Sequence, residues 1–335
     1  MATIVARQLA ISTAKLLLRG ASGTSRRDYS TIASAAAEVV AGLTGLELDI
    51  ASVTIEGVNR QEWAEYNIDS YTTLLDHLAP SGRPTSVGVA ELNAVALGVL
   101  LGTFASKVLG QYEPAFVSAQ PRVWMVDENI DNFAEQADLN ANEVALWVLV
   151  HELTHRAQFY GVPWFRSRIV ELMTQLFAAS TMSPIDLVGE VFARLRGLGA
   201  GQSLDISTLL LPERLRAVAQ EATSMMTVAE GHAEWVMRQV PKELIPHRDA
   251  FETAIDARRQ TGGIAKVIAQ VSGLTAKRSQ YSRGLHFFEV LAEVDAEAPR
   301  RVFAEPRGLP TADELAEPKR WLMRMGFTPV QALRA

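Results

Sequence analysis

Residues 140–160, which read NANEVALWVLVHELTHRAQFY, are the stretch that decides how this chain is expected to fold. Asn140 stands three residues before a glutamate, which is a form of the capping box that starts helices. A nearly unbroken apolar run follows, so the stretch predicts a helix through the protein interior. His151 and His155 are spaced by four residues and would face the same side of this helix, one turn apart.

The five residues from His151 to His155 read HELTH, which is an H-E-x-x-H motif. Two such histidines can hold one Zn²⁺ through ring nitrogens at about 2.0–2.1 Å. Glu152 lies beside the first histidine, where it can reach a water and act as a general base. With 6 histidines in 335 residues, the motif would arise by chance on the order of 0.01 times per chain. The competing interpretation is a pair of hydrogen-bonded structural histidines on a core helix.

A hydrolytic zinc site needs a third protein ligand and an open fourth position. The chain has no cysteine, and Gly161 stands where an extended metzincin motif needs another histidine. We therefore expect the third ligand on a second helix, within residues 222–239. Glu230 is the favoured ligand, and His232 and Glu234 are the alternatives.

The neighbours of Glu230 have expected roles of their own. Glu234 follows it by one turn and is predicted to accept the Nδ1–H of a ligand histidine. Gly231 would let a facing helix approach closely. His232 lies about 200° around the helix from Glu230, so we expect it to bond within the core or to contact substrate.

A donor for the developing oxyanion is the remaining part of a hydrolytic site. Tyr281 is the chosen candidate, and His286 and Tyr112 are further ones. For each of them an ordinary packing or surface role competes, because sequence spacing does not fix a distance to the metal.

Helical periodicity dominates the rest of the chain and predicts a mainly α fold, a multi-helix core with at most a small β-sheet. Residues 123–126 are the best strand candidate, and residues 53–55 are a weaker one. The uncharged run 92–106 is shorter than the roughly 20 residues of a membrane span. It predicts a buried helix in which Gly98 and Gly102 permit close packing.

The chain divides by composition into three expected regions. These are an N-terminal helical region over 1–120, a metal-binding region over 121–297, and a C-terminal tail over 298–335 that would run over the surface. All three could also share one compact core, since no boundary signal is strong.

Charge and composition exclude several classes of protein. The 38 acidic and 32 basic residues give a net charge of −6, which argues against nucleic-acid binding. The absence of cysteine excludes disulfide scaffolds, thiol catalysis and cysteine-ligated metals. The first 27 residues contain basic but no acidic side chains, a pattern that a transit peptide shares with an ordinary first surface helix. We expect the second interpretation, and with it a soluble cytoplasmic protein that does not bind membranes.

Several short segments besides the zinc motif carry a resemblance to a known family. They are residues 59–63, 108–114, 151–159, 162–164, 230–233, 236–237, 280–281 and 309–311. They resemble an uncharacterised bacterial zincin-like family whose members are labelled "putative hydrolase" or deazaflavin-coenzyme-biosynthesis-associated protein. The resemblance implies a mostly helical, zincin-like metallohydrolase of unknown substrate. The EGHA segment at 230–233 is also similar to the third-ligand helix of gluzincin peptidases, and Arg238 departs from relatives that often carry an acid there.

The sequence thus predicts a zinc-dependent hydrolase of the peptidase or amidase type. His151, His155 and Glu230 would bind Zn²⁺, and Glu152 would be the general base. The substrate would be a peptide or a small amide, such as a conjugate in cofactor metabolism. The alternative is a catalytically inactive zincin-like binding or scaffold protein. Two histidines and a carboxylate would also suit iron or manganese.

Overall fold

The protein is described here by a computed structural model that covers residues 5–19, 26–78, 88–113, 122–179, 213–251, 253–254 and 278–327. Helices predominate in these residues and a single small sheet accompanies them, which confirms the predicted mainly α class. The α-helices are α1 (Arg7–Leu17), α2 (Ser30–Thr44), α3 (Arg60–Leu78), α4 (Val89–Ala105), α5 (Asp127–Ala137), α6 (Ala141–Tyr160), α7 (Pro163–Ala179), α9 (Glu213–Arg238), α12 (Arg278–Val294), α13 (Ala298–Ala304), α14 (Ala312–Ala316) and α15 (Pro318–Arg324). Two short 3₁₀ turns, η1 (Ile50–Ser52) and η3 (Pro306–Gly308), also lie in the described residues.

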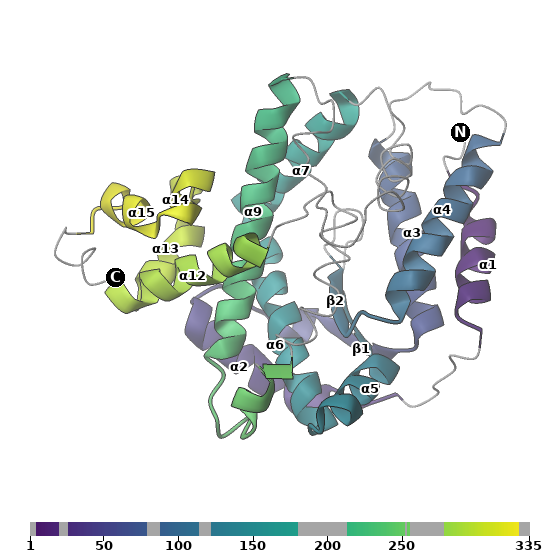
Figure 1. The fold of residues 1–335 in the computed structure, drawn as a ribbon, viewed down its shortest axis with the longest axis horizontal. Coiled ribbons are helices and arrows are strands. Elements are labelled where there is room, and N and C mark those ends of the chain that lie inside the picture. The colour runs from purple at the N-terminus through teal and green to yellow at the C-terminus, as the bar shows by residue number, and fades with distance from the viewer. Residues whose placement is uncertain are drawn as a thin grey trace.

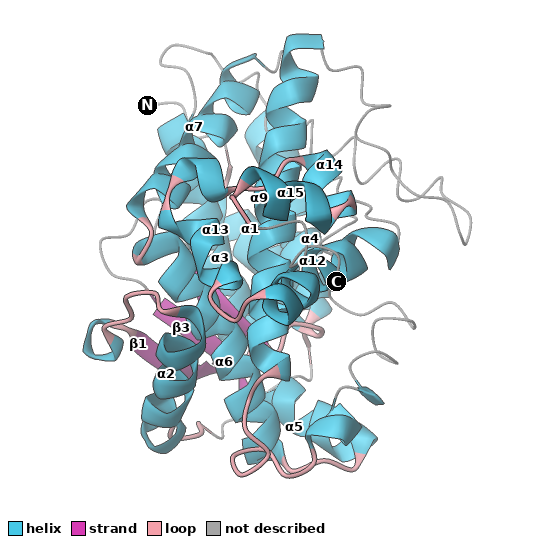
Figure 2. Ribbon diagram, turned by 90° about the vertical axis from the view of Figure 1, so that its left-hand side faces the viewer, coloured by secondary structure: helices cyan, strands magenta, loops and turns pink. Residues whose placement is uncertain are grey.

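The sheet has three strands in the order β1–β3–β2. Strand β1 (Thr54–Val58) runs parallel to β3 (Arg122–Val126), and β2 (Gly110–Glu113) runs antiparallel to it. The two expected strands correspond to β3 and β1, whereas β2 was not predicted. Figure 1 shows the sheet and α6 near the middle, with α1, α3 and α4 on one side and α9 and α12–α15 on the other. Figure 2 shows the strands beside α2 and α6.

Strand β3 separates two hydrophobic clusters. Val123 and Met125 belong to the larger cluster around α2, α6, α9 and α12, whereas Trp124 and Val126 belong to the smaller one around α1, α3 and α4. Successive side chains of a strand point to opposite faces, so β3 supplies one wall to each cluster. The sheet therefore joins the N-terminal helices to the part of the protein that carries the H-E-x-x-H motif.

The apolar helix α4 packs closely against α1 through its two glycines. A Cβ at Gly98 would lie 2.4 Å from the Ala10 carbonyl oxygen, and one at Gly102 would lie 3.1 Å from Ala14 Cα. The close packing predicted at Gly98 and Gly102 is observed, and its partner is α1. Arg7 and Lys15 of α1 pair with Asp69 and Glu65 of α3, so α1 is tied to two helices. Within the described residues no helix is long and apolar enough to cross a membrane.

The C-terminal elements also contribute to the core. Trp321 of α15 is fully buried, and its indole N–H donates to the Gly308 carbonyl at 2.6 Å. Phe303 of α13 is buried against Phe165 of α7 and Phe288 of α12. The stretch expected to run over the surface therefore fills part of the larger hydrophobic cluster, up to Phe327.

Candidate metal centre

Helix α6 begins and ends where the sequence predicted. The Asn140 side chain accepts hydrogen bonds from the main-chain N–H groups of Asn142 and Glu143, and Gly161 is the C-cap. The residues between are almost all buried, so the helix runs through the interior. His151 and His155 lie in its second half and face α9.

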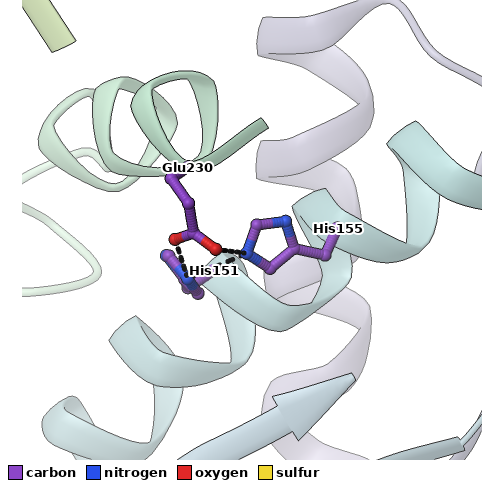
Figure 3. Close-up of side chains that lie close together, drawn as sticks. All are labelled: His151, His155 and Glu230. Atoms are coloured by element: carbon purple, nitrogen blue, oxygen red, sulfur yellow. Dashed lines mark hydrogen bonds and ion pairs between the residues drawn. The ribbon is translucent and has the colours of Figure 1, made fainter. Parts of the chain in front are cut away.

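Three side chains from α6 and α9 converge at one point (Figure 3). The Nε2 atoms of His151 and His155 are 3.0 Å apart. Glu230 of α9 places one carboxylate oxygen 3.6 Å from each of these nitrogens. Among the described residues, these three form the group of side chains that could hold a metal ion. The structure thus brings together the three residues that the sequence singled out as ligands.

The partners of the two Nδ1 atoms indicate where each imidazole carries its proton. His155 Nδ1 lies 2.9 Å from Gln158 Oε1, and His151 Nδ1 lies 3.0 Å from the thioether sulfur of Met237. Amide oxygen and thioether sulfur can only accept, so both Nδ1 atoms carry the proton and both Nε2 atoms present a lone pair. The two Nε2 lone pairs and the Glu230 carboxylate therefore face one another. They repel each other electrostatically, and a bound cation would remove this repulsion.

The spacing of these atoms fits a zinc ion. Ligands at about 2.0–2.1 Å in a tetrahedral site are separated by about 3.3–3.4 Å. The observed separations of 3.0 and 3.6 Å bracket that value. The group supplies three protein ligands, which is the number that catalytic zinc sites use.

Glu152 is held by the main chain of β2 rather than by a side chain. Its Oε2 accepts a 2.6 Å hydrogen bond from the Tyr112 N–H. Val126 N–H bonds to the Leu109 carbonyl, and because the pairs of an antiparallel ladder alternate, the Tyr112 amide points away from β3 toward α6. The carboxylate therefore has a fixed position beside the two histidines.

The environment of Glu152 changes its acidity. Burial raises the pKa of Glu152 to about 7, and the negative charge of Glu230 acts in the same direction. A protonated His155 and the hydrogen bond from the Tyr112 N–H act in the opposite direction. A carboxyl group with such a pKa can exchange a proton near neutral pH.

Two glycines bring α12 against the helix that carries Glu230. A Cβ at Gly231 would lie 2.3 Å from the Gly284 main-chain carbon, and one at Gly284 would lie 2.4 Å from the Thr227 carbonyl oxygen. Side chains at either position would force the helices apart. The close approach predicted for Gly231 is thus observed. Helix α9 packs against α12 here and against α6 as well.

The remaining predicted residues lie in different surroundings. His232 is buried among Trp235, Phe288 and Phe303, and burial lowers its pKa to about 3. Glu234 is buried and accepts a 2.9 Å hydrogen bond from Arg238. Its predicted bond to the Nδ1–H of a ligand histidine is not among the contacts described, because the Nδ1 atoms of His155 and His151 face Gln158 and Met237 instead.

Among the described residues, the side chains of the oxyanion candidates make no contact that places a donor at the centre. Tyr281 belongs to α12, and its side chain lies outside the described residues. His286 is exposed on the same helix. The Tyr112 ring is buried and stacks on Phe159, with ring centroids 6.3 Å apart.

Sequence reasoning missed three groups at this centre: Gln158, Met237 and the main-chain N–H of Tyr112. Gln158 follows His155 by three residues and Met237 follows Glu230 by seven, so both lie on the faces of their helices that carry the ligands. Helical spacing could have indicated these two side chains. The Tyr112 amide carries no sequence signal, because every residue except proline has the same group.

Comparison with known proteins agrees with this geometry. A model of the zincin-like metallopeptidase family matches residues 1–322, so the chain belongs to that family. No curated protein matches the chain. A crystal structure from Chloroflexus aurantiacus, described as a "putative hydrolase with a novel fold", is similar with a TM-score of 0.73 and 27% sequence identity. The similarity covers 96% of this chain and 98% of that one.

Proposed function

We propose that this protein is a zinc-dependent hydrolase that cleaves an amide bond, in a peptide or in a small amide. The observation that carries the proposal is the convergence of His151, His155 and Glu230 beside a buried carboxylate. Membership of the zincin-like metallopeptidase family and the similarity to a protein described as a hydrolase support it.

Each of these residues has one task in the proposed reaction. His151, His155 and Glu230 would hold the ion. When bound, Zn²⁺ would supply a Lewis acid that makes water more acidic and polarises a carbonyl group. Glu152, with its pKa raised to about 7, accepts the proton of the attacking water and returns it to the leaving amine. The Tyr112 N–H keeps that carboxylate in place during both transfers.

Replacement of Glu152 by Gln tests this division of tasks. Glutamine keeps the shape of the side chain but cannot accept the proton. We expect both the native protein and Glu152→Gln to bind one zinc per chain, and Glu152→Gln to lose about 10²–10⁴-fold in turnover, which is the usual contribution of a general base. Zinc would be counted by elemental analysis, and turnover measured on a mixed library of fluorogenic peptides and aryl amides.

The outcomes separate the hydrolase from an inactive scaffold. Native protein that binds zinc but cleaves no member of either library would favour the scaffold. Full activity of Glu152→Gln would overturn the role of this residue. A native protein that binds no zinc after dialysis against it would overturn the metal site.

A further inference from the structure

We propose that Gln158 is the positioning residue of the metal centre, because its single amide group sets the tautomer of His155 and ties that histidine to the helix that carries Glu230. This inference rests on the proposed metal site and deepens it. Gln158 is fully buried, and each polar atom of its side chain has a partner.

The orientation of the Gln158 amide follows from one contact. Its Nε2 lies 3.0 Å from the main-chain oxygen of Ala229, which can only accept a hydrogen bond. The atom at this contact must therefore be the nitrogen, and the oxygen must face His155. Because that oxygen can only accept, the proton of His155 has to lie on Nδ1. Nε2 is then left with its lone pair directed at His151 and Glu230.

His232 prevents the amide from turning over. Its Nδ1 lies 3.0 Å from Gln158 Nε2, and because an amide nitrogen only donates, Nδ1 accepts the second N–H when the proton of His232 is on its Nε2. A reversed amide would place its oxygen against both this nitrogen and the Ala229 carbonyl. The imidazole is fully buried and packs against Phe288 and Phe303, with ring centroids 4.8 Å from each.

The same amide also links the two helices that carry the ligands. Ala229 directly precedes Glu230, so the bond from Gln158 to its carbonyl connects α6 to α9 next to the carboxylate ligand. His155 and Glu230 are thus held by one side chain that spans both helices. A leucine would fill similar space but could make none of these bonds, and a carboxylate could not donate to Ala229.

The first test is made on the native protein without metal. In free histidine the Nε2–H tautomer is preferred, so Nδ1–H at His155 would report an imposed arrangement. Two-bond ¹⁵N–¹H correlation at pH 8, where imidazoles are mostly neutral, distinguishes the tautomers. We expect Nδ1–H for His155, with its signals assigned through a His155→Asn variant. Nε2–H at this residue would overturn the proposal.

The second test compares zinc affinity in two variants by competition with a chelator. Gln158→Leu is expected to bind zinc about 10–100-fold more weakly, which is the usual cost of losing an outer-shell partner. Thr154→Val is the matched control, since Thr154 is equally buried on α6 but bonds to the Val150 carbonyl of its own helix. It should stay within about twofold of the native affinity. Equal affinities for Gln158→Leu and the native protein would overturn the proposal.

The two proposals fail in different ways. If the native protein bound no zinc, the proposed function would be lost, and Nδ1–H at His155 would show only that Gln158 sets the tautomer of this histidine. If zinc bound and Gln158→Leu bound it equally well, the hydrolase would stand and Gln158 would be a packing residue. Should Gln158→Leu not fold, the tautomer measurement on the native protein decides alone.

Discussion

The Tyr112 N–H donates a hydrogen bond of 2.6 Å to the carboxylate of Glu152, and so joins the edge of the sheet to the helix that carries His151 and His155. The bond is made by main chain, which makes its geometry depend on how closely β2 approaches α6. Gly110 sets that approach, since a Cβ there would lie 2.6 Å from Val148 Cγ1 and 3.1 Å from Glu152 Cγ.

Gly110→Ala is therefore expected to push β2 away from α6. Overpacking of this kind typically costs about 1–3 kcal/mol of folding free energy. Turnover should fall as well, because the carboxylate loses its fixed donor. Gly42→Ala is the control, because a Cβ there meets nothing within 4 Å in the helix α2, and alanine should stabilise that helix by about 0.5–1 kcal/mol. Denaturant unfolding of both variants tests the pair, and equal stabilities would contradict the role of Gly110.

Gly231→Ala should separate α9 from α12. The new Cβ would meet main-chain atoms of Gly284 at 2.3–2.7 Å, and main chain cannot turn aside as a side chain can. We expect a loss of about 1–3 kcal/mol in stability together with weaker zinc binding, because Glu230 moves with α9. Calorimetric titration with zinc measures the second effect. A variant with native affinity and native melting temperature would show that the two helices are free to slide.

Glu230→Gln should remove the charged ligand while keeping its shape. Zinc added to the native protein should raise the melting temperature, since a ligand at 100 times its Kd contributes about 2.7 kcal/mol. That rise should largely vanish in Glu230→Gln. Glu221→Gln is the control on the same helix, as Glu221 pairs with Arg168 at the surface. A zinc-dependent rise of native size in Glu230→Gln would exclude this residue as a ligand.

The dependence of stability on pH should carry a contribution from Glu314. Burial alone would raise the pKa of this carboxyl group, but hydrogen bonds from Arg324 and from the Thr311 N–H outweigh it and lower the pKa. A lowered pKa in the folded state means that the contribution is complete above the unfolded value of about 4.3 and is lost as the pH falls through the folded value.

Glu314→Gln should therefore be less stable than the native protein at pH 7, and the difference should shrink as the pH is lowered from about 5 to 3. Urea unfolding across this range measures it. Glu317→Gln provides the control, because Glu317 pairs with Arg320 at the surface of the same region and should change stability by less than about 1 kcal/mol. A difference between Glu314→Gln and native protein that does not depend on pH would contradict the assignment.

The parts of the site that sequence predicts are those encoded locally. The spacing of His151 and His155 needs only one helix, and the capping signal at Asn140 needs only its next three residues. Glu230 is harder to predict from sequence, because it reaches the centre from a distant helix. The EGHA segment that it begins nevertheless indicated it. The mainly α class followed from periodicity over long segments.

The parts that sequence did not predict depend on contacts between distant elements. Strand β2 is short and reads GQYE. It lacks the alternation of apolar and polar residues that predicts a strand. Its contact with Glu152 is made by an amide that looks alike in every sequence. Trp321 and Phe303 lie in a stretch rich in charged residues and proline, and their burial depends on the aromatic cluster that α7 and α12 provide.

Strand β3 has a consequence for how this chain can change in evolution. Its side chains alternate between the two hydrophobic clusters. The loss or gain of one residue would therefore place Trp124 in the cluster around α6, where Val123 and Met125 now lie. Both cores would be mispacked by a single indel. We therefore expect homologous chains to vary freely in the length of their connecting segments while keeping the length of this five-residue strand constant.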